Sequence, residues 1–190
     1  ADAVRRSSRD ARSTAAWLGE GQHAVSLGCF PAGHIAGVSS LLRSFVPGSD
    51  SVLLDAWDAG LAASLVEAHR ATSSAGTPYF LTSLIEAAER EGRDIRSLRR
   101  FMVGAANVPR TVVETADEFG IAAYRAYGST EHPTVTSGDA SDPLDRRAST
   151  DGRLTPGNEL RIVDEEGRDT PPGEPGEIAT RGPEQALGYS

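Results

Sequence analysis

The sequence predicts an α/β protein with a doubly wound, mostly parallel sheet and helices on both faces, followed by the start of a small antiparallel β unit. Two observations lead to this prediction. Short apolar runs alternate with amphipathic stretches over residues 1–136, whereas residues 137–190 are rich in Gly, Pro, Asp and Glu. We therefore expect an α/β unit over 1–136 and an incomplete β-rich unit over 137–190.

Each element of the first unit follows from its local pattern. Strands are expected at the short apolar runs 25–30, 52–55, 71–76, 101–103 and 121–126. Helices are expected over 2–18 and 33–45, and after Asp58, Pro78 and Pro109. Asp58 is a good N-cap, and the two prolines suit a first helical turn. Gly92 and Gly120 can end the last two helices.

The second unit is predicted to contain a β-hairpin. Residues 159–164 and 177–181 have the pattern of short, half-buried strands. Glu165-Glu166-Gly167 and the proline–glycine run 171–176 indicate turns between these strands. This hairpin by itself predicts no chemistry.

Composition excludes several classes of function. All 19 basic residues are arginine against 27 acidic residues, and a net charge of −8 argues against binding to nucleic acid or to anionic membranes. No apolar run is long enough to span a bilayer and no signal peptide is recognisable, so a cytoplasmic protein is expected. One cysteine, Cys29, and four scattered histidines give no disulfide and no metal-ligand spacing. Because the sequence has no lysine, it contains neither a P-loop nor a lysine that could act as a base or form a Schiff base.

The sharpest candidate site is Tyr127-Gly128-Ser129-Thr130-Glu131, which directly follows a predicted strand. Ligands of open α/β sheets bind at the carboxyl ends of the strands. An aromatic face there can stack on a purine, hydroxyls can bond to phosphate, and a carboxylate can hold Mg²⁺. The alternative is a strand–turn–helix junction, with Ser129 or Thr130 as N-cap and Glu131 in the first helical turn.

Three weaker motifs accompany it. Residues 103–107, Val-Gly-Ala-Ala-Asn, have small side chains after a strand, which either admit a planar ligand or serve βα packing. Residues 31–37 contain His34, which either lines a pocket or is a half-buried histidine whose hydrogen bonds are made within the protein. Residues 155–164 and 172–178 read as hairpin sequence alone.

In this order and spacing, the four motifs resemble the adenylate-forming superfamily of acyl- and aryl-CoA synthetases, luciferases and peptide-synthetase adenylation domains. Residues 127–131 are similar to its Y-G-x-T-E motif and residues 104–106 to its adenine-covering loop. Residues 31–37 are similar to its P-x-x-H-x-x-G segment, and residues 176–189 to its Gly-Glu-Ile and R-G-P…G-Y elements. The form Tyr-Gly-Ser-Thr-Glu-His-Pro most resembles acyl-CoA synthetases acting on fatty or alicyclic acids.

The resemblance implies a two-step reaction. A carboxylic acid attacks the α-phosphate of Mg·ATP to give acyl-adenylate and pyrophosphate, and a thiol, expected to be CoA, then displaces AMP. Catalysis of this kind depends mainly on positioning and on neutralising phosphate charge.

The resemblance also implies roles for individual residues. Tyr127 would stack on adenine, and the nucleotide-binding loop continues through Gly128 and Ser129. Thr130 would contact phosphate and Glu131 would bind Mg²⁺, which makes these two the expected catalytic residues. The residues implied to cover the other side of adenine are Gly104, Ala105 and Ala106. The residues implied to border the acyl pocket are His34 and Gly128.

Some family features are absent from the sequence. The phosphate loop with its lysine would lie before residue 1, and the ribose-binding aspartate of Y-x-T-G-D would lie after residue 190. We therefore expect an internal piece of the large N-terminal domain of a CoA ligase, inactive alone. Asn107 stands where the family usually has proline. His132 receives no role and is expected to be partly exposed.

Three alternatives stay open. An amino-acid-activating adenylation domain usually places an aspartate near the segment that holds His34, and residues 31–34 contain none. A degenerate, non-catalytic nucleotide-binding module would keep the same motifs. A generic nucleotide-binding domain is disfavoured because no G-x-G-x-x-G follows the first strand. The identity of the acid, the choice between CoA and a carrier protein, and the oligomeric state stay open as well.

Overall fold

The computed structural model describes residues 24–43, 45 and 49–189. The helix predicted over residues 2–18 lies outside this part of the chain. The strands of the large sheet are β1 (Ala24–Gly28), β2 (Ser49–Leu53), β3 (Ser73–Gly76), β4 (Arg100–Val103), β5 (Ala122–Tyr127), β6 (Thr136–Ser137) and β7 (Arg153–Leu154). The helices are α2 (Ile35–Arg43), α3 (Ala59–His69), α4 (Pro78–Glu91), α5 (Arg110–Glu118) and α6 (Leu144–Ser149).

The large sheet is mostly parallel, as predicted. Its strand order is β2-β1-β3-β4-β5-β6-β7. The first five strands in this order pair in parallel, and β6 and β7 extend the sheet in antiparallel fashion. The α/β fold with a doubly wound sheet is therefore confirmed.

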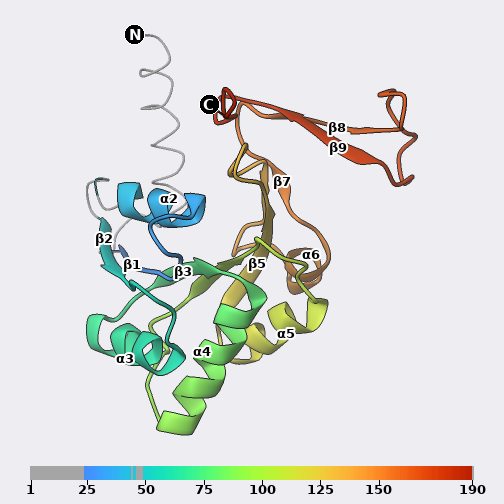
Figure 1. Cartoon of the computed structure of the whole chain (residues 1–190). Coiled ribbons are helices and arrows are strands. Elements are labelled where there is room, and N and C mark those ends of the chain that lie inside the picture. The colour runs from blue at the N-terminus through green and yellow to red at the C-terminus, as the bar shows by residue number, and fades with distance from the viewer. Residues whose placement is uncertain (1–23, 44, 46–48, 190) are drawn as a thin grey trace.

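The chain reverses its direction of winding at β1. It moves outward to β2 through α2, returns across β1 to β3 through α3, and continues to β4 and β5 through α4 and α5. Figure 1 shows α3, α4 and α5 covering one face of the sheet and α2 lying over the other. Loops leaving β1 and β3 therefore diverge, which creates the crevice where open α/β sheets bind ligands.

The buried core lies between the sheet and the layer of α3, α4 and α5. Successive strand side chains point to opposite faces of a sheet. In β4, Phe101 and Val103 are fully buried in this core, whereas Arg100 and Met102 face the side of the sheet that α2 partly covers. One face of the sheet thus stabilises the fold, and the other is available for a ligand.

The predicted helix ends are mostly correct. Asp58 caps α3 by accepting a hydrogen bond from the Leu61 backbone N–H at 2.7 Å. Pro78 stands in the first turn of α4, and Gly92 ends that helix with φ at 66°. Pro109 is the N-cap of α5 and therefore precedes its first turn.

Several predicted boundaries are wrong. Strand β2 begins at Ser49 although its first residues are polar, because they pair in register with β1 at the edge of the described sheet. Helix α2 begins at Ile35 because the chain first makes a turn in which the His34 N–H donates to the Pro31 carbonyl at 2.9 Å. Elements β6, β7 and α6 were not predicted, since they are short and carry little apolar periodicity.

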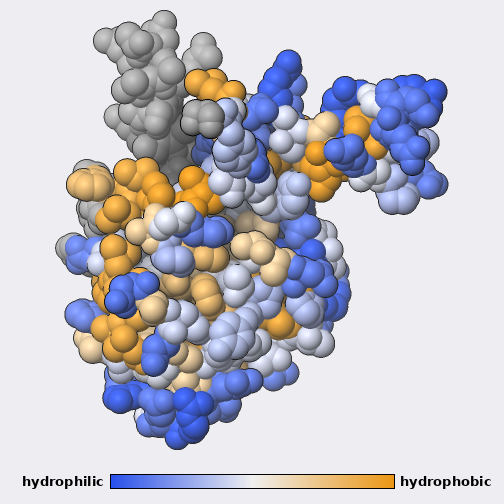
Figure 2. Space-filling model, in the orientation of Figure 1, coloured by the Kyte–Doolittle hydropathy of each residue, from blue (hydrophilic) through white to orange (hydrophobic). Residues whose placement is uncertain are grey.

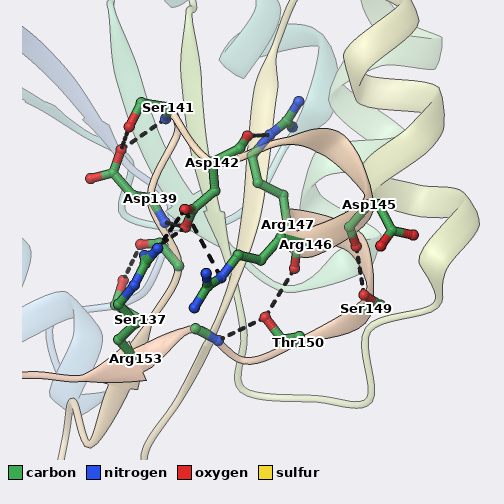
Figure 3. Close-up of polar contacts among 12 residues, drawn as sticks. Ser137, Asp139, Ser141, Asp142, Asp145, Arg146, Arg147, Ser149, Thr150 and Arg153 are labelled. Carbon is green, nitrogen blue, oxygen red and sulfur yellow. Dashed lines mark hydrogen bonds and ion pairs between the residues drawn. The ribbon is translucent and has the colours of Figure 1, made fainter.

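An ionic network fastens α6 to the sheet, and Figure 3 shows its centre around Asp142. The Asp142 carboxylate accepts two hydrogen bonds from Arg153, each of 2.9 Å. Arg147 is only 6% exposed. Its guanidinium donates to the Ala123 carbonyl at 2.8 Å and to the Asp142 carbonyl at 3.0 Å, and it pairs with Asp117. These contacts tie α6 to both β5 and α5.

The predicted hairpin is formed by β8 (Glu159–Val163) and β9 (Glu177–Arg181), which pair antiparallel. It projects from the large sheet (Figure 1), and its far end is mainly hydrophilic (Figure 2). Apolar atoms gather instead around α2, where Val38, Leu41 and Leu42 are exposed (Figure 2). Within the described residues, every helix is too short or too polar to cross a lipid bilayer.

Candidate active site

A cleft of about 330 Å³ opens at the carboxyl ends of the parallel strands, beside the point where the winding reverses. Its walls come from α2, from the ends of β3, β4 and β5, and from the loops that follow β1, β4 and β5. The predicted site residues that line it are His34, Gly104, Ala105, Tyr127, Gly128, Ser129 and Thr130. Glu131 follows directly and is exposed.

Ala106 is the predicted site residue that the structure places away from the cleft. It is exposed and does not belong to the cleft lining. The reason is the backbone of Ala105, whose φ of 59° turns the chain outward. This left-handed conformation is unusual for a residue with a side chain.

His34 is held in place by aromatic rings. Its imidazole stacks on Phe30 with ring centroids 4.8 Å apart, and Phe30 meets the edge of Phe80 at 5.4 Å. Phe80 in turn stacks on Trp57 at 4.4 Å. The His34 Nδ1 accepts a hydrogen bond from the Ala36 N–H at 3.1 Å, so in this arrangement the proton is on Nε2. His34 can therefore offer an N–H donor to a ligand.

Two glycines allow the walls of the cleft to approach closely. A Cβ on Gly104 would lie 2.9 Å from the Ala126 carbonyl oxygen. A Cβ on Gly128 would lie 2.0 Å from the Pro133 carbonyl oxygen. Both distances are shorter than real Cβ contacts, so these positions require glycine for packing.

The loop after β5 closes on itself as a tight turn. The Ser129 N–H donates to the His132 carbonyl at 2.9 Å, and the His132 N–H donates to the Ser129 hydroxyl at 3.2 Å. The next element after this turn is strand β6 rather than a helix, so the N-cap alternative for Ser129 and Thr130 is wrong. Thr130 at the tip is exposed and lines the cleft.

His132 is buried, contrary to the expectation of partial exposure. Only 3% of it is accessible to solvent. Its Nε2 lies 3.1 Å from Asn158 Oδ1 and its Nδ1 lies 2.9 Å from the Thr180 hydroxyl. Asn158 also donates through Nδ2 to the Thr134 carbonyl at 2.8 Å. These bonds anchor the loop to the β8–β9 hairpin, which no local pattern could reveal.

Glu131 has a partner that the sequence did not indicate. The Tyr189 hydroxyl donates to Glu131 Oε1 at 2.5 Å, and the Ala186 N–H donates to the Glu131 carbonyl at 2.6 Å. The Tyr189 hydrogen bond is the main reason that the pKa of Glu131 lies below its ordinary value. The same contact raises the pKa of Tyr189.

The rim of the cleft fits Mg²⁺ by its donor chemistry. Magnesium prefers oxygen ligands and is usually bound by one or two carboxylates together with substrate phosphates and water. Glu131 supplies an ionised, exposed carboxylate, and Thr130 supplies a neighbouring hydroxyl. The described part of the chain holds no cluster of three or more His, Cys, Asp or Glu side chains that could hold a metal ion.

The deep end of the cleft was missed by the sequence interpretation. Its lining there includes Ser26, Ser73, Arg100, Met102 and Tyr124. The available signal was the composition of β3, Ser-Ser-Ala-Gly, because central parallel strands usually consist of Val, Ile and Leu.

Comparison with known proteins gives consistent results. The family model described as AMP-binding enzyme matches residues 4–190. The medium-chain fatty-acid–CoA ligase of Escherichia coli K12 is 34% identical over 160 residues, which cover 84% of this chain and 28% of the relative. The 2-succinylbenzoate–CoA ligase of Bacillus mycoides is 29% identical over 163 residues, which cover 86% and 34%. The chain thus spans about a third of the length of these relatives.

Solved structures show the same architecture. The o-succinylbenzoate coenzyme A synthetase of Bacillus subtilis, solved in complex with ATP and magnesium ion, has a TM-score of 0.80 at 25% identity. That match covers 95% of this chain and 37% of the synthetase. An amide bond synthetase from Marinactinospora thermotolerans has a TM-score of 0.76 at 28% identity and covers 90% and 35%.

Proposed function

Because the chain belongs to the AMP-binding enzyme family, we propose that it forms part of an ATP-dependent acid–CoA ligase. The reaction converts a carboxylate and ATP into acyl-adenylate and pyrophosphate. The thiol of CoA then takes the acyl group and releases AMP. A carboxylate is a poor acyl donor, and adenylation gives it a good leaving group.

The observation that carries this proposal is the single cleft into which the separate motifs converge. His34 comes from the loop after β1, Gly104 from the loop after β4, and Tyr127 to Thr130 from the end of β5. A ligand in this cleft contacts an aromatic ring, backbone edges and hydroxyls at once. Such convergence suits a purine nucleotide joined to an organic acid.

The nucleotide is proposed to lie at the rim. Tyr127 stacks on adenine, with the backbone of Gly104, Ala105 and Ala106 on the side of the nucleotide opposite the ring. The outward turn at Ala105 keeps Ala106 exposed, so its contact with adenine is the weakest of this group. The Gly128 backbone passes close to the sugar–phosphate because its hydrogen replaces a side chain.

The phosphates are proposed to lie beside the tip of the loop. Thr130 and Ser129 donate hydroxyl hydrogens to phosphate oxygens, and Glu131 holds Mg²⁺. When bound, this ion neutralises part of the phosphate charge. The Glu131 carboxylate is ionised at neutral pH, as a glutamate ordinarily is, and the hydrogen bond from the Tyr189 hydroxyl lowers its pKa further.

The acid is proposed to enter beneath α2, with His34 and Gly128 at the entrance. The structure argues against an amino acid as the substrate. None of the described residues that line the cleft is Asp or Glu, and the carboxylate at its rim, Glu131, is assigned to Mg²⁺, so no lining carboxylate is left to pair with an α-ammonium group.

The proposal is tested by ATP–pyrophosphate exchange with a panel of carboxylic acids, using the complete gene product. We expect acid-dependent exchange that requires Mg²⁺, and a thioester once CoA is added. Glu131→Gln lowers kcat by about 100-fold, as expected when a charge that stabilises the transition state is removed. Glu86→Gln, which changes an exposed carboxylate on α4, leaves kcat unchanged.

Absence of exchange with every acid, despite ATP binding, would establish the non-catalytic module instead. Exchange with amino acids alone would establish the amino-acid-activating alternative. The 190 residues contain no lysine, and the family resemblance implies two functional lysines. We therefore expect the chain by itself to give no exchange under the same conditions.

A further inference from the structure

Residues 182–189, which follow β9, run back along the loop that carries Glu131. The Ala186 N–H donates to the Glu131 carbonyl at 2.6 Å. The Tyr189 hydroxyl donates to Glu131 Oε1 at 2.5 Å. This segment therefore holds both the backbone and the side chain of the residue that is proposed to bind Mg²⁺.

Close packing fixes the path of the segment where it begins. Near the end of β9, the Thr180 hydroxyl is hydrogen-bonded to His132 Nδ1 at 2.9 Å. A Cβ on Gly182 would lie 1.9 Å from Asn158 Oδ1 and 3.0 Å from His132 Nε2, so the chain passes this point only with glycine. Tyr189 thus reaches Glu131 from a segment that is already anchored to the same loop.

Tyr189 can influence a ligand only through Glu131. It does not belong to the described residues that line the cleft, and it is 81% exposed. A nucleotide or an acid in the cleft therefore does not touch it. The hydrogen bond to the Glu131 carboxylate is the route by which this tyrosine can act on the site.

The Glu131 carboxylate has three hydrogen-bond donors. The Tyr189 hydroxyl lowers its pKa most, followed by the Glu131 N–H and the Ser129 hydroxyl. Ser129 is proposed to donate to a phosphate oxygen once ATP binds. Tyr189 is then the hydroxyl that stays on the carboxylate.

A hydrogen bond to one carboxylate oxygen changes which metal ions the carboxylate suits. Mg²⁺ is small, demands nearly octahedral geometry, and is held by one or two carboxylates together with phosphates and water. Ca²⁺ is larger, takes about six to eight oxygen ligands, and accepts a carboxylate through both of its oxygens. The Tyr189 proton occupies a lone pair of Oε1 and draws charge from it, so Glu131 presents mainly Oε2 to an ion.

We propose that Tyr189 is a positioning residue that makes Glu131 a one-oxygen ligand and thereby favours Mg²⁺ over Ca²⁺ in complex with ATP. Phenylalanine in its place releases Oε1, and the carboxylate can then turn both oxygens toward the larger ion. The inference rests on the proposed function, in which Glu131 binds the metal of Mg·ATP. It specifies which metal the site selects, through a residue outside the cleft.

The test measures the affinity of the complete gene product for ATP by calorimetry, with Mg²⁺ or Ca²⁺ at a concentration that saturates the nucleotide. We expect the wild-type protein to bind Mg·ATP more tightly than Ca·ATP. Tyr189→Phe should reduce this preference about tenfold, the scale of one hydrogen bond to a charged group at an exposed position. The change should come mainly from tighter binding of Ca·ATP, and a misfolded protein cannot give a gain of affinity.

The possible failures of this test are distinguishable. Equal affinity of the wild-type protein for the two complexes would overturn the inference, and so would an unchanged preference in Tyr189→Phe. Equal weakening of both complexes in the variant would indicate a merely structural role and would also overturn it. These outcomes leave the proposed function intact. Absence of ATP binding by the wild-type protein with either metal would instead overturn the proposed function.

Tyr79→Phe is the matched control. It removes the hydroxyl of another exposed tyrosine, which lies on α4 and outside the lining of the cleft. We expect the preference for Mg·ATP to be unchanged in this variant. A shift as large as that in Tyr189→Phe would show that the effect is not specific to the contact with Glu131 and would overturn the assignment.

A double-mutant cycle tests whether Tyr189 acts through Glu131. In Glu131→Gln the carboxylate is gone, so adding Tyr189→Phe should leave the ratio of the Mg·ATP and Ca·ATP affinities unchanged. A shift of about tenfold in this background as well would mean that Tyr189 affects the metal by another route, and the proposal would be wrong.

Discussion

Replacing Arg147 by methionine should destabilise the protein strongly, because this arginine is a buried member of the network in Figure 3. The Ala123 and Asp142 carbonyls would each lose a charged donor, and a buried acceptor left unbonded costs about 1–3 kcal/mol. Asp117 adds little because its side chain is 38% exposed and can bind water instead. Methionine fills most of the vacated volume, so the expected loss is about 3 kcal/mol.

Urea denaturation followed by circular dichroism measures this loss. With a slope of about 2 kcal/mol per molar urea, the midpoint should fall by about 1.5 M. The control is Arg146→Met on the same helix, whose side chain is 45% exposed and lies 4.0 Å from Asp142. Exposed positions of this kind change stability by no more than about 0.5 kcal/mol. Equal midpoints for the two variants would refute the reasoning from buried hydrogen bonds.

Three further predictions concern the candidate active site. Tyr189→Phe should raise the pKa of Glu131 toward its ordinary value, measured by carbon NMR of the carboxylate. Because the folded-state pKa of Glu131 is lowered, the stability gained from this contact is present above the ordinary pKa and is lost as pH falls through the lowered value. An unchanged titration would show that Tyr189 is not the cause. Gly128→Ala should abolish ATP binding by calorimetry, since its Cβ would meet the Pro133 carbonyl, whereas Gly33→Ala meets nothing within 4 Å and should bind normally. Ala105→Gly should raise the free energy of unfolding by up to about 1 kcal/mol, because glycine adopts its positive φ without strain; a loss of stability would contradict this.

The sequence predicted the elements that carry strong local signals. Helix α4 has a proline at its start, periodic leucines and a glycine at its end, and it was identified correctly. Residues 127–130 were located because a strand end is where an α/β sheet displays its ligand-binding groups. These predictions needed only local chemistry and a general rule of topology.

The parts that could not be predicted depend on contacts between distant segments. Tyr189 meets Glu131 across 58 residues, and Arg147 reaches Ala123 across 24. Burial of His132 follows from the position of the hairpin, which no local pattern specifies. The start of strand β2 was predicted too late, because its first residues are polar and have low strand propensity. Their backbone pairing with β1 outweighs that propensity.

The contact between Glu131 and Tyr189 also has a consequence for the order of events during synthesis. The 58 residues that follow Glu131, up to and including Tyr189, take about 3–12 s to make at the usual rate of translation. The strands that form the large sheet end at residue 154, so all of them are made before Tyr189. The contact between Tyr189 and Glu131 therefore forms only after all the described strands of the large sheet have been made.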